Sequence, residues 1–289
     1  MTKLKTVLVA SVALLLTACG GASEGGATAT NPSQSDGTLI VAGSTTVTPL
    51  MRELQAVFEA SQDDIRLEIQ EIGTSAGVNA TIDGISDIAM ASRALKDSEI
   101  EAGLTPVSIA MDGVAIIVHN DNPVDELTLA QIEAIFRGEI TNWSEVGGND
   151  ATITVVSREA GSGMRDAFEE FTNVRDEMQV GDEVVYVSAV YENAVVSSGT
   201  GAVLATVSSN ENAIGYLTTG VAKDVVRAVG VDGVHFSKEA AKDGSYALAN
   251  IFYIATMPDV SDDAQTFVDW IISPEGQSVV ESAEYIALH

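Results

Sequence analysis

Residues 39–50 read LIVAGSTTVTPL, and this stretch decides the expected fold. The apolar run 39–42 predicts a short buried strand. The next four residues, 43–46, form a turn of small and hydroxyl-bearing residues. Apolar residues then recur at helical spacing from Leu50 to Phe58, and Pro49 suits the first turn of a helix. The stretch therefore predicts a strand that passes through a tight turn into a helix.

Similar alternation continues along the chain. Apolar or alternating runs predict strands at 65–72, 85–91, 107–111, 113–119, 153–157 and 251–255. Helical periodicity predicts helices at 127–136, 164–171, 266–272 and 275–280. Strands that alternate with helices predict an α/β fold with open, mainly parallel sheets.

Two further turns share the chemistry of the first. Residues 73–77 (GTSAG) and 161–163 (GSG) each lie between an expected strand and an expected helix. Free N–H groups at a helix N-terminus favour anions, and hydroxyl groups add donors. Arg158 and Arg165 flank the last turn, and Arg93 follows Ser92; a guanidinium fork suits a tetrahedral oxyanion. Three such turns predict an oxyanion site; the alternative is that each is a plain helix cap and each arginine a surface ion pair.

Composition excludes several classes of protein. The 289 residues are 46% apolar and 19% charged, as in globular proteins, and 14 basic against 42 acidic residues give a net charge of −28. This acidity argues against binding to nucleic acid or to anionic lipid by charge. His119, His235 and His289 show no metal-ligand spacing, and neither a Walker P-loop nor a Gly-x-Ser-x-Gly elbow occurs. We therefore expect no metal, no cofactor and no enzymatic activity.

The N-terminal residues have the pattern of an export signal. Lys3 and Lys5 precede an apolar run at 7–16 that is too short to span a bilayer. Residues 16–19 (LTAC) resemble the bacterial lipobox, in which the cysteine is acylated and becomes the mature N-terminus. We expect a signal peptide at 1–18 and a flexible lipidated tether at 19–37, anchored through Cys19. The alternative is an ordinary signal with an incidental cysteine; because Cys19 is the only cysteine, no intramolecular disulfide is possible.

Residues 38–289 resemble the phosphate-binding proteins of bacterial ABC phosphate importers, the PstS type. The specific motifs are GSTTVTPL at 43–50, DIAMASR at 87–93, IFRGEITNW at 135–143 and VSREAGSG at 156–163, with AIGY at 213–216 and SPEGQ at 273–277. The resemblance implies a periplasmic-binding-protein fold of two α/β lobes joined by a two-stranded hinge, with phosphate in the cleft. It places lobe one at 38–112 plus 247–289 and lobe two at 113–246.

The resemblance also implies the binding residues. They are Ser44, Thr45, Thr46, Thr74, Ser75, Ser92, Arg158, Ser162, Gly163 and Met164. Two of them depart from the family pattern, because some members have an acceptor Asp in place of Ser92 and a donor Thr in place of Met164. A carboxylate would accept the proton of hydrogen phosphate and repel sulfate. Asp112 is the candidate for that acceptor; its alternative role is as a turn or hinge residue.

The resemblance thus predicts an extracytoplasmic lipoprotein that captures inorganic phosphate. Its expected partners are the permease and ATPase subunits of an ABC importer, with the membrane reached through the lipid alone, and a monomer is expected. Three alternatives remain open: a binding protein for sulfate or molybdate, a surface phosphatase, and a lipoprotein that senses or adheres.

Overall fold

A computed structural model describes residues 37–62, 64–181, 183–221 and 225–289. The expected signal peptide, Cys19 and the expected tether up to residue 36 lie outside the described residues. Within the described ranges, no helix combines the length and the apolar character needed to cross a membrane.

Buried apolar side chains form four clusters, which define two lobes. Lobe one packs around two clusters drawn from residues 39–110 and 252–285. Its elements are β1 (Thr38–Gly43), α1 (Thr48–Ser61), β2 (Arg66–Glu71), α2 (Thr74–Ile82), β3 (Ile88–Ala91), α3 (Asp97–Glu101), β13 (Ala249–Thr256), α8 (Asp262–Ile272) and α9 (Pro274–Ser282). The expected amphipathic helix after Pro49 is confirmed as α1, whose buried stripe includes Leu50, Leu54 and Phe58.

Lobe two packs around the other two clusters, drawn from residues 114–248. Its elements are β5 (Glu126–Leu127), α4 (Leu129–Phe136), η1 (Trp143–Val146), β6 (Thr154–Arg158), α5 (Gly163–Phe171), β7 (Arg175–Val180), β8 (Glu183–Ser188), β9 (Val195–Ser197), α6 (Thr200–Ser208), β10 (Ala213–Thr218), β11 (Arg227–Ala228), β12 (Gly230–Val231) and α7 (Lys238–Lys242). The expected residue boundaries of the lobes stay a prediction.

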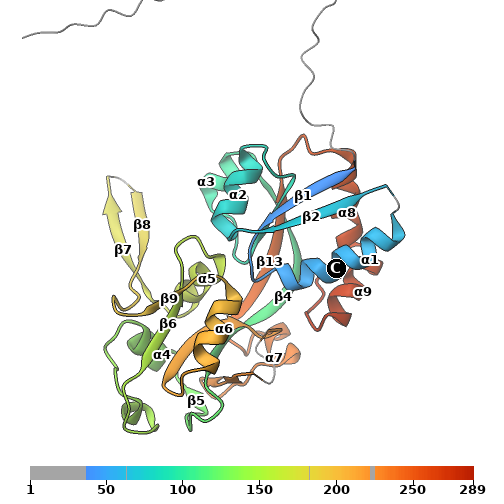
Figure 1. Cartoon of the computed structure of the whole chain (residues 1–289). Coiled ribbons are helices and arrows are strands. Elements are labelled where there is room, and N and C mark those ends of the chain that lie inside the picture. The colour runs from blue at the N-terminus through green and yellow to red at the C-terminus, as the bar shows by residue number, and fades with distance from the viewer. Residues whose placement is uncertain (1–36, 63, 182, 222–224) are drawn as a thin grey trace, which may run out of the picture. The chain divides into compact units, whose positions relative to one another are not determined.

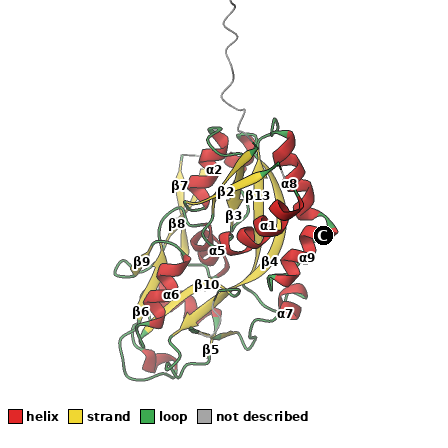
Figure 2. Cartoon of the chain, turned by 45° about the vertical axis from the view of Figure 1, so that its right-hand side comes forward, coloured by secondary structure: helices red, strands yellow, loops and turns green. Residues whose placement is uncertain are grey.

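One long strand, β4 (Thr105–Val118), belongs to both lobes. Its first part pairs with β13 as far as Gly113, and its second part pairs with β10 from Val114 onward. The main sheet runs in the order β2-β1-β3-β13-β4-β10-β6-β9, with β11 also on β4. Figures 1 and 2 show β4 and β13 side by side between the two groups of elements.

Two expectations about the sheet need correction. The strands expected at 107–111 and 113–119 form one continuous strand, β4. Asp112 does not interrupt this strand, because its buried carboxylate accepts hydrogen bonds from Thr218 and Thr219. The sheet is also mixed rather than mainly parallel. Within the main sheet, the pairs that involve neither β4 nor β13, such as β1 with β2 and β6 with β9, are parallel, whereas every pair that involves β4 or β13 is antiparallel. The crossing strands therefore give the sheet its mixed character.

Candidate functional site

The first turn follows β1 and presents two threonine side chains to lobe two. Ser44 shapes this turn, because its Oγ accepts from the amides of Thr46 at 3.2 Å and Val47 at 3.4 Å. The Oγ1 atoms of Thr45 and Thr46 each lie 3.3 Å from the Thr200 hydroxyl of α6. The turn thus brings hydroxyl groups from two lobes together, although the residues are more than 150 positions apart in sequence.

Ser92 joins the first turn to the second. Its hydroxyl accepts from Ser44 Oγ at 3.0 Å and lies 3.5 Å from Thr74 Oγ1, which also accepts from the Ser92 amide at 3.4 Å. The side chains of Thr74 and Ser92 are fully buried. Because a hydroxyl can donate and accept, this group can adapt to an anion in more than one protonation state.

The start of α5 in lobe two lies directly against these hydroxyls. A Cβ atom at Gly163 would stand 2.4 Å from Thr74 Oγ1 and 2.9 Å from Ser92 Oγ, so only glycine allows this approach. Ser162 caps the helix, with its Oγ accepting from the Arg165 amide at 3.3 Å. Among the described residues, the amides of Gly163 and Met164 have no acceptor. They are free donors at the positive end of a helix.

Arg158 ends β6 and supplies a buried positive charge, with only 2% of the residue exposed. Its Nη2 donates to Thr45 Oγ1 at 3.1 Å, and its Nη1 donates to Thr200 Oγ1 at 3.4 Å. Glu159 fixes the guanidinium through two hydrogen bonds of 2.8 Å. Burial by itself would raise the pKa of Glu159, but the bonds from Arg158 bring that pKa below its ordinary value.

A buried tyrosine holds the backbone behind Arg158. Tyr216 OH accepts from the Arg158 amide at 3.1 Å and lies 2.9 Å from Ser157 Oγ. Burial raises the pKa of Tyr216 to about 12, so the phenol remains protonated. The β6 end that carries Arg158 is therefore anchored inside lobe two.

Ser75 lies at the edge of the group. Its amide donates to Gly161 O across the lobes at 3.1 Å, and its Oγ accepts from Arg93 Nη2 at 3.5 Å. Arg165, which flanks the third turn, pairs within its own helix with Glu169 at 2.6 Å. Neither side chain contacts the Thr45, Thr74 or Arg158 side chains among the described hydrogen bonds.

Asp112 is placed at the crossing between the lobes. Its carboxylate accepts from the Gly113 amide at 2.8 Å, from the Gly220 amide at 3.3 Å, and from the hydroxyls of Thr218 and Thr219. Burial raises the pKa of Asp112 above its ordinary value, and these four donors oppose that rise. None of the donors is a predicted binding residue, so these contacts favour the hinge role over the role of proton acceptor.

Thr200 was not predicted, although the sequence carried a signal for it. Residues 197–201 (SSGTG) run from the end of β9 into the start of α6 and repeat the pattern of strand, small turn and helix. The side chain is 6% exposed and contacts Thr45, Thr46 and Arg158. We call Thr45, Thr46, Thr74, Ser92, Arg158 and Thr200, together with the Gly163 and Met164 amides, the donor group.

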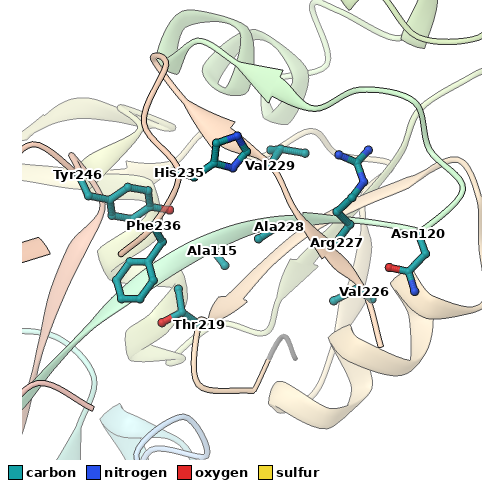
Figure 3. A pocket seen from close by; sticks show the side chains of 10 residues that line it. All are labelled: Ala115, Asn120, Thr219, Val226, Arg227, Ala228, Val229, His235, Phe236 and Tyr246. Carbon is teal, nitrogen blue, oxygen red and sulfur yellow. The ribbon is translucent and has the colours of Figure 1, made fainter. Parts of the chain in front are cut away.

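A separate cavity of about 460 Å³ lies in lobe two (Figure 3) and contains none of the predicted binding residues. Its arginine is already engaged: Arg227 donates to Asp125 Oδ1 at 2.8 Å and to two backbone oxygens. Tyr246 OH donates to Val114 O at 2.8 Å. Within the described part of the chain, no cluster of three or more His, Cys, Asp or Glu residues suits a metal ion. The donor group therefore remains the candidate site.

Comparisons with known proteins identify the family of this chain. The family model of the PBP superfamily domain matches residues 28–275. The phosphate-binding protein PstS of Staphylococcus epidermidis is 31% identical over 302 residues, which cover 98% of this chain and 87% of that protein.

Two solved structures are also similar. A protein from Clostridium perfringens, described as a phosphate ABC transporter substrate-binding protein and solved with bound phosphate, is 41% identical with a TM-score of 0.80, over 87% of this chain and 100% of that one. An ABC-type phosphate transport receptor from Vibrio cholerae is 31% identical with a TM-score of 0.72, over 86% of this chain and 100% of that one. This chain therefore belongs to the PBP superfamily and, within it, to the PstS family.

Proposed function

We propose that the protein binds inorganic phosphate outside the cytoplasm and delivers it to an ABC importer. The observation that carries the proposal is the donor group, in which Arg158 and hydroxyls from both lobes converge beside free amides of α5. Phosphate loses its water when it is enclosed, so the protein must replace many hydrogen bonds. Fixed amides, hydroxyls and one guanidinium do this without a large excess of positive charge.

The choice among oxyanions depends on which groups can accept a proton. Within the described residues, no carboxylate forms a hydrogen bond to the hydroxyls of Ser44, Thr74 or Ser92, and Glu159 is engaged by Arg158 and the Gly199 amide. This keeps sulfate or molybdate as the second candidate ligand. Phosphate is favoured because the serine and threonine hydroxyls can themselves accept from hydrogen phosphate, and because the similar protein from Clostridium perfringens was solved with phosphate.

Calorimetric titration of the purified protein with phosphate, sulfate and molybdate tests this choice. We expect phosphate to bind and the other two anions to compete weakly. Binding of sulfate or molybdate without binding of phosphate would reject the assignment.

The proposed role is capture rather than catalysis. Its partners would be the permease and ATPase subunits of the importer, met by a monomer that Cys19 holds at the membrane through a lipid. The names of the relatives, which are binding proteins and a transport receptor, support the transport role. Turnover of a phosphate ester by the pure protein would instead favour a surface hydrolase.

A further inference from the structure

A second link between the lobes lies beside the donor group. Arg93 directly follows Ser92 in lobe one, and Asp166 lies in the first turn of α5 in lobe two. Arg93 Nε donates to Asp166 Oδ2 at 2.8 Å. The Arg93 side chain is 7% exposed and that of Asp166 is 33% exposed, so the pair is partly shielded from solvent.

Arg93 is held in position by its own lobe. Glu99 of α3 accepts from Nη1 at 2.8 Å and from Nη2 at 2.7 Å, and Ala94 O accepts from Nη1 at 2.9 Å. Burial by itself would lower the pKa of Arg93, but Glu99 and Asp166 raise it above its ordinary value. The guanidinium is therefore a fixed cation of lobe one whose Nε is directed toward Asp166 of lobe two.

Among the described residues, one other ion pair joins the lobes. Lys238 Nζ and Glu284 Oε2 are 4.0 Å apart, at 35% and 62% side-chain exposure, so solvent weakens that pair strongly. Arg93 and Asp166 instead line a cavity of about 620 Å³ together with residues of both lobes, including Lys96 and Glu169. Their pair lies at the boundary where the lobes would part.

We propose that the Arg93–Asp166 ion pair is a latch that holds the lobes together and sets how long a bound anion stays. The proposal rests on the proposed function. The pair exists only while the lobes are in contact, so it stabilises the closed state and contributes nothing to the open one. Its loss should therefore accelerate anion release and leave association largely unchanged.

Electrostatics alone predicts that removing the Asp166 charge strengthens anion retention, which is the opposite of what the latch predicts. This carboxylate lies three residues from Gly163, so removing its charge should favour a nearby anion if nothing else changed. The latch predicts that Asp166→Asn weakens retention in spite of that gain. The substitution preserves the shape of the side chain and leaves the bonds between Arg93 and Glu99 in place.

The test is release of radiolabelled phosphate into excess unlabelled phosphate, with association rates measured in parallel. For Asp166→Asn we expect phosphate release to be about five- to tenfold faster than in wild type. This size is between the effects of breaking an exposed and a buried ion pair, because the Arg93–Asp166 pair is partly shielded from solvent. The association rate should stay within about twofold of wild type. Asp176→Asn is the matched control, because it breaks a 2.8 Å pair with Arg137 inside lobe two. Asp176→Asn should leave the rate of phosphate release unchanged. Thermal unfolding of each variant checks that it is folded.

The outcomes separate the two proposals. Phosphate binding by wild type with unchanged or slower release from Asp166→Asn overturns the latch alone. Equal acceleration by Asp176→Asn overturns it as well, because that pair does not join the lobes. A wild-type protein that binds no phosphate overturns the proposed function and this inference with it.

Discussion

Replacement of Thr200 by valine tests the residue that the structure adds to the candidate site. Valine keeps the β-branched shape and removes one hydroxyl, so packing around this 6% exposed side chain should survive. The lost group lies 3.3 Å from the hydroxyls of Thr45 and Thr46 and 3.4 Å from Arg158 Nη1. Thr200→Val should therefore weaken phosphate binding.

The expected magnitude follows from these distances. A hydrogen bond from the Thr200 hydroxyl to a charged ligand contributes about 1.5–3 kcal/mol to binding, and this hydroxyl also accepts a long bond of 3.4 Å from Arg158. We therefore expect the lower end, about 1.5 kcal/mol, which corresponds to a roughly tenfold increase in Kd. Calorimetric titration with phosphate measures this change directly.

A matched control exists on the same helix. Thr206 of α6 is also partly buried, but its hydroxyl donates to Ala202 O at 2.8 Å and lies 3.5 Å from Ser197 Oγ, away from Arg158. Thr206→Val should leave Kd within about twofold of wild type. If Thr200→Val also leaves Kd within that range at an unchanged melting temperature, the Thr200 hydroxyl has no part in binding and the reasoning fails.

Three further predictions follow from the same contacts and from the N-terminal sequence. Arg158→Ala should raise the Kd for phosphate at least about 30-fold, because loss of one partner of a buried charge pair costs about 2 kcal/mol or more. Arg52→Ala, which breaks the exposed pair with Glu71, is the control. Equal calorimetric affinities for the two variants would show that Arg158 is not part of the site. Burial by itself would raise the pKa of Glu99, but Arg93 brings it below 4.5, so the pair stabilises the fold above about pH 4.5 and this stabilisation is lost as pH falls through the lowered pKa. In chemical denaturation at several pH values, the advantage of wild type over Glu99→Gln should thus be constant above about pH 4.5 and shrink below it, and a constant advantage down to about pH 3 would contradict the prediction. Cys19→Ser should release the protein from membrane fractions and keep its affinity for phosphate; retention in the membrane fraction would argue against the lipid anchor.

Local patterns along the chain predicted most of the elements near the site. The stretch 39–50 predicted β1, its turn and α1, because alternation, small turn residues and helical spacing act over a few neighbouring residues. The β7–β8 hairpin was not predicted. About half of the surface is exposed in four of its apolar residues, Met178, Val180, Val184 and Tyr186. Because these side chains do not alternate between a buried and an exposed face, hydrophobic periodicity does not predict the hairpin.

The sequence by itself determined the α/β character, the three hydroxyl-rich turns and the arginine beside the third, since each is written in adjacent residues. Only the tertiary structure decided that β4 is one strand shared by both lobes, that Asp112 is held at the crossing, and that Thr200 meets Thr46 across 154 positions. Such contacts depend on which strands pair and in which register, and no local propensity specifies a partner so distant in the chain. The candidate site is therefore made of locally predictable turns, whose meeting is a property of the folded sheet.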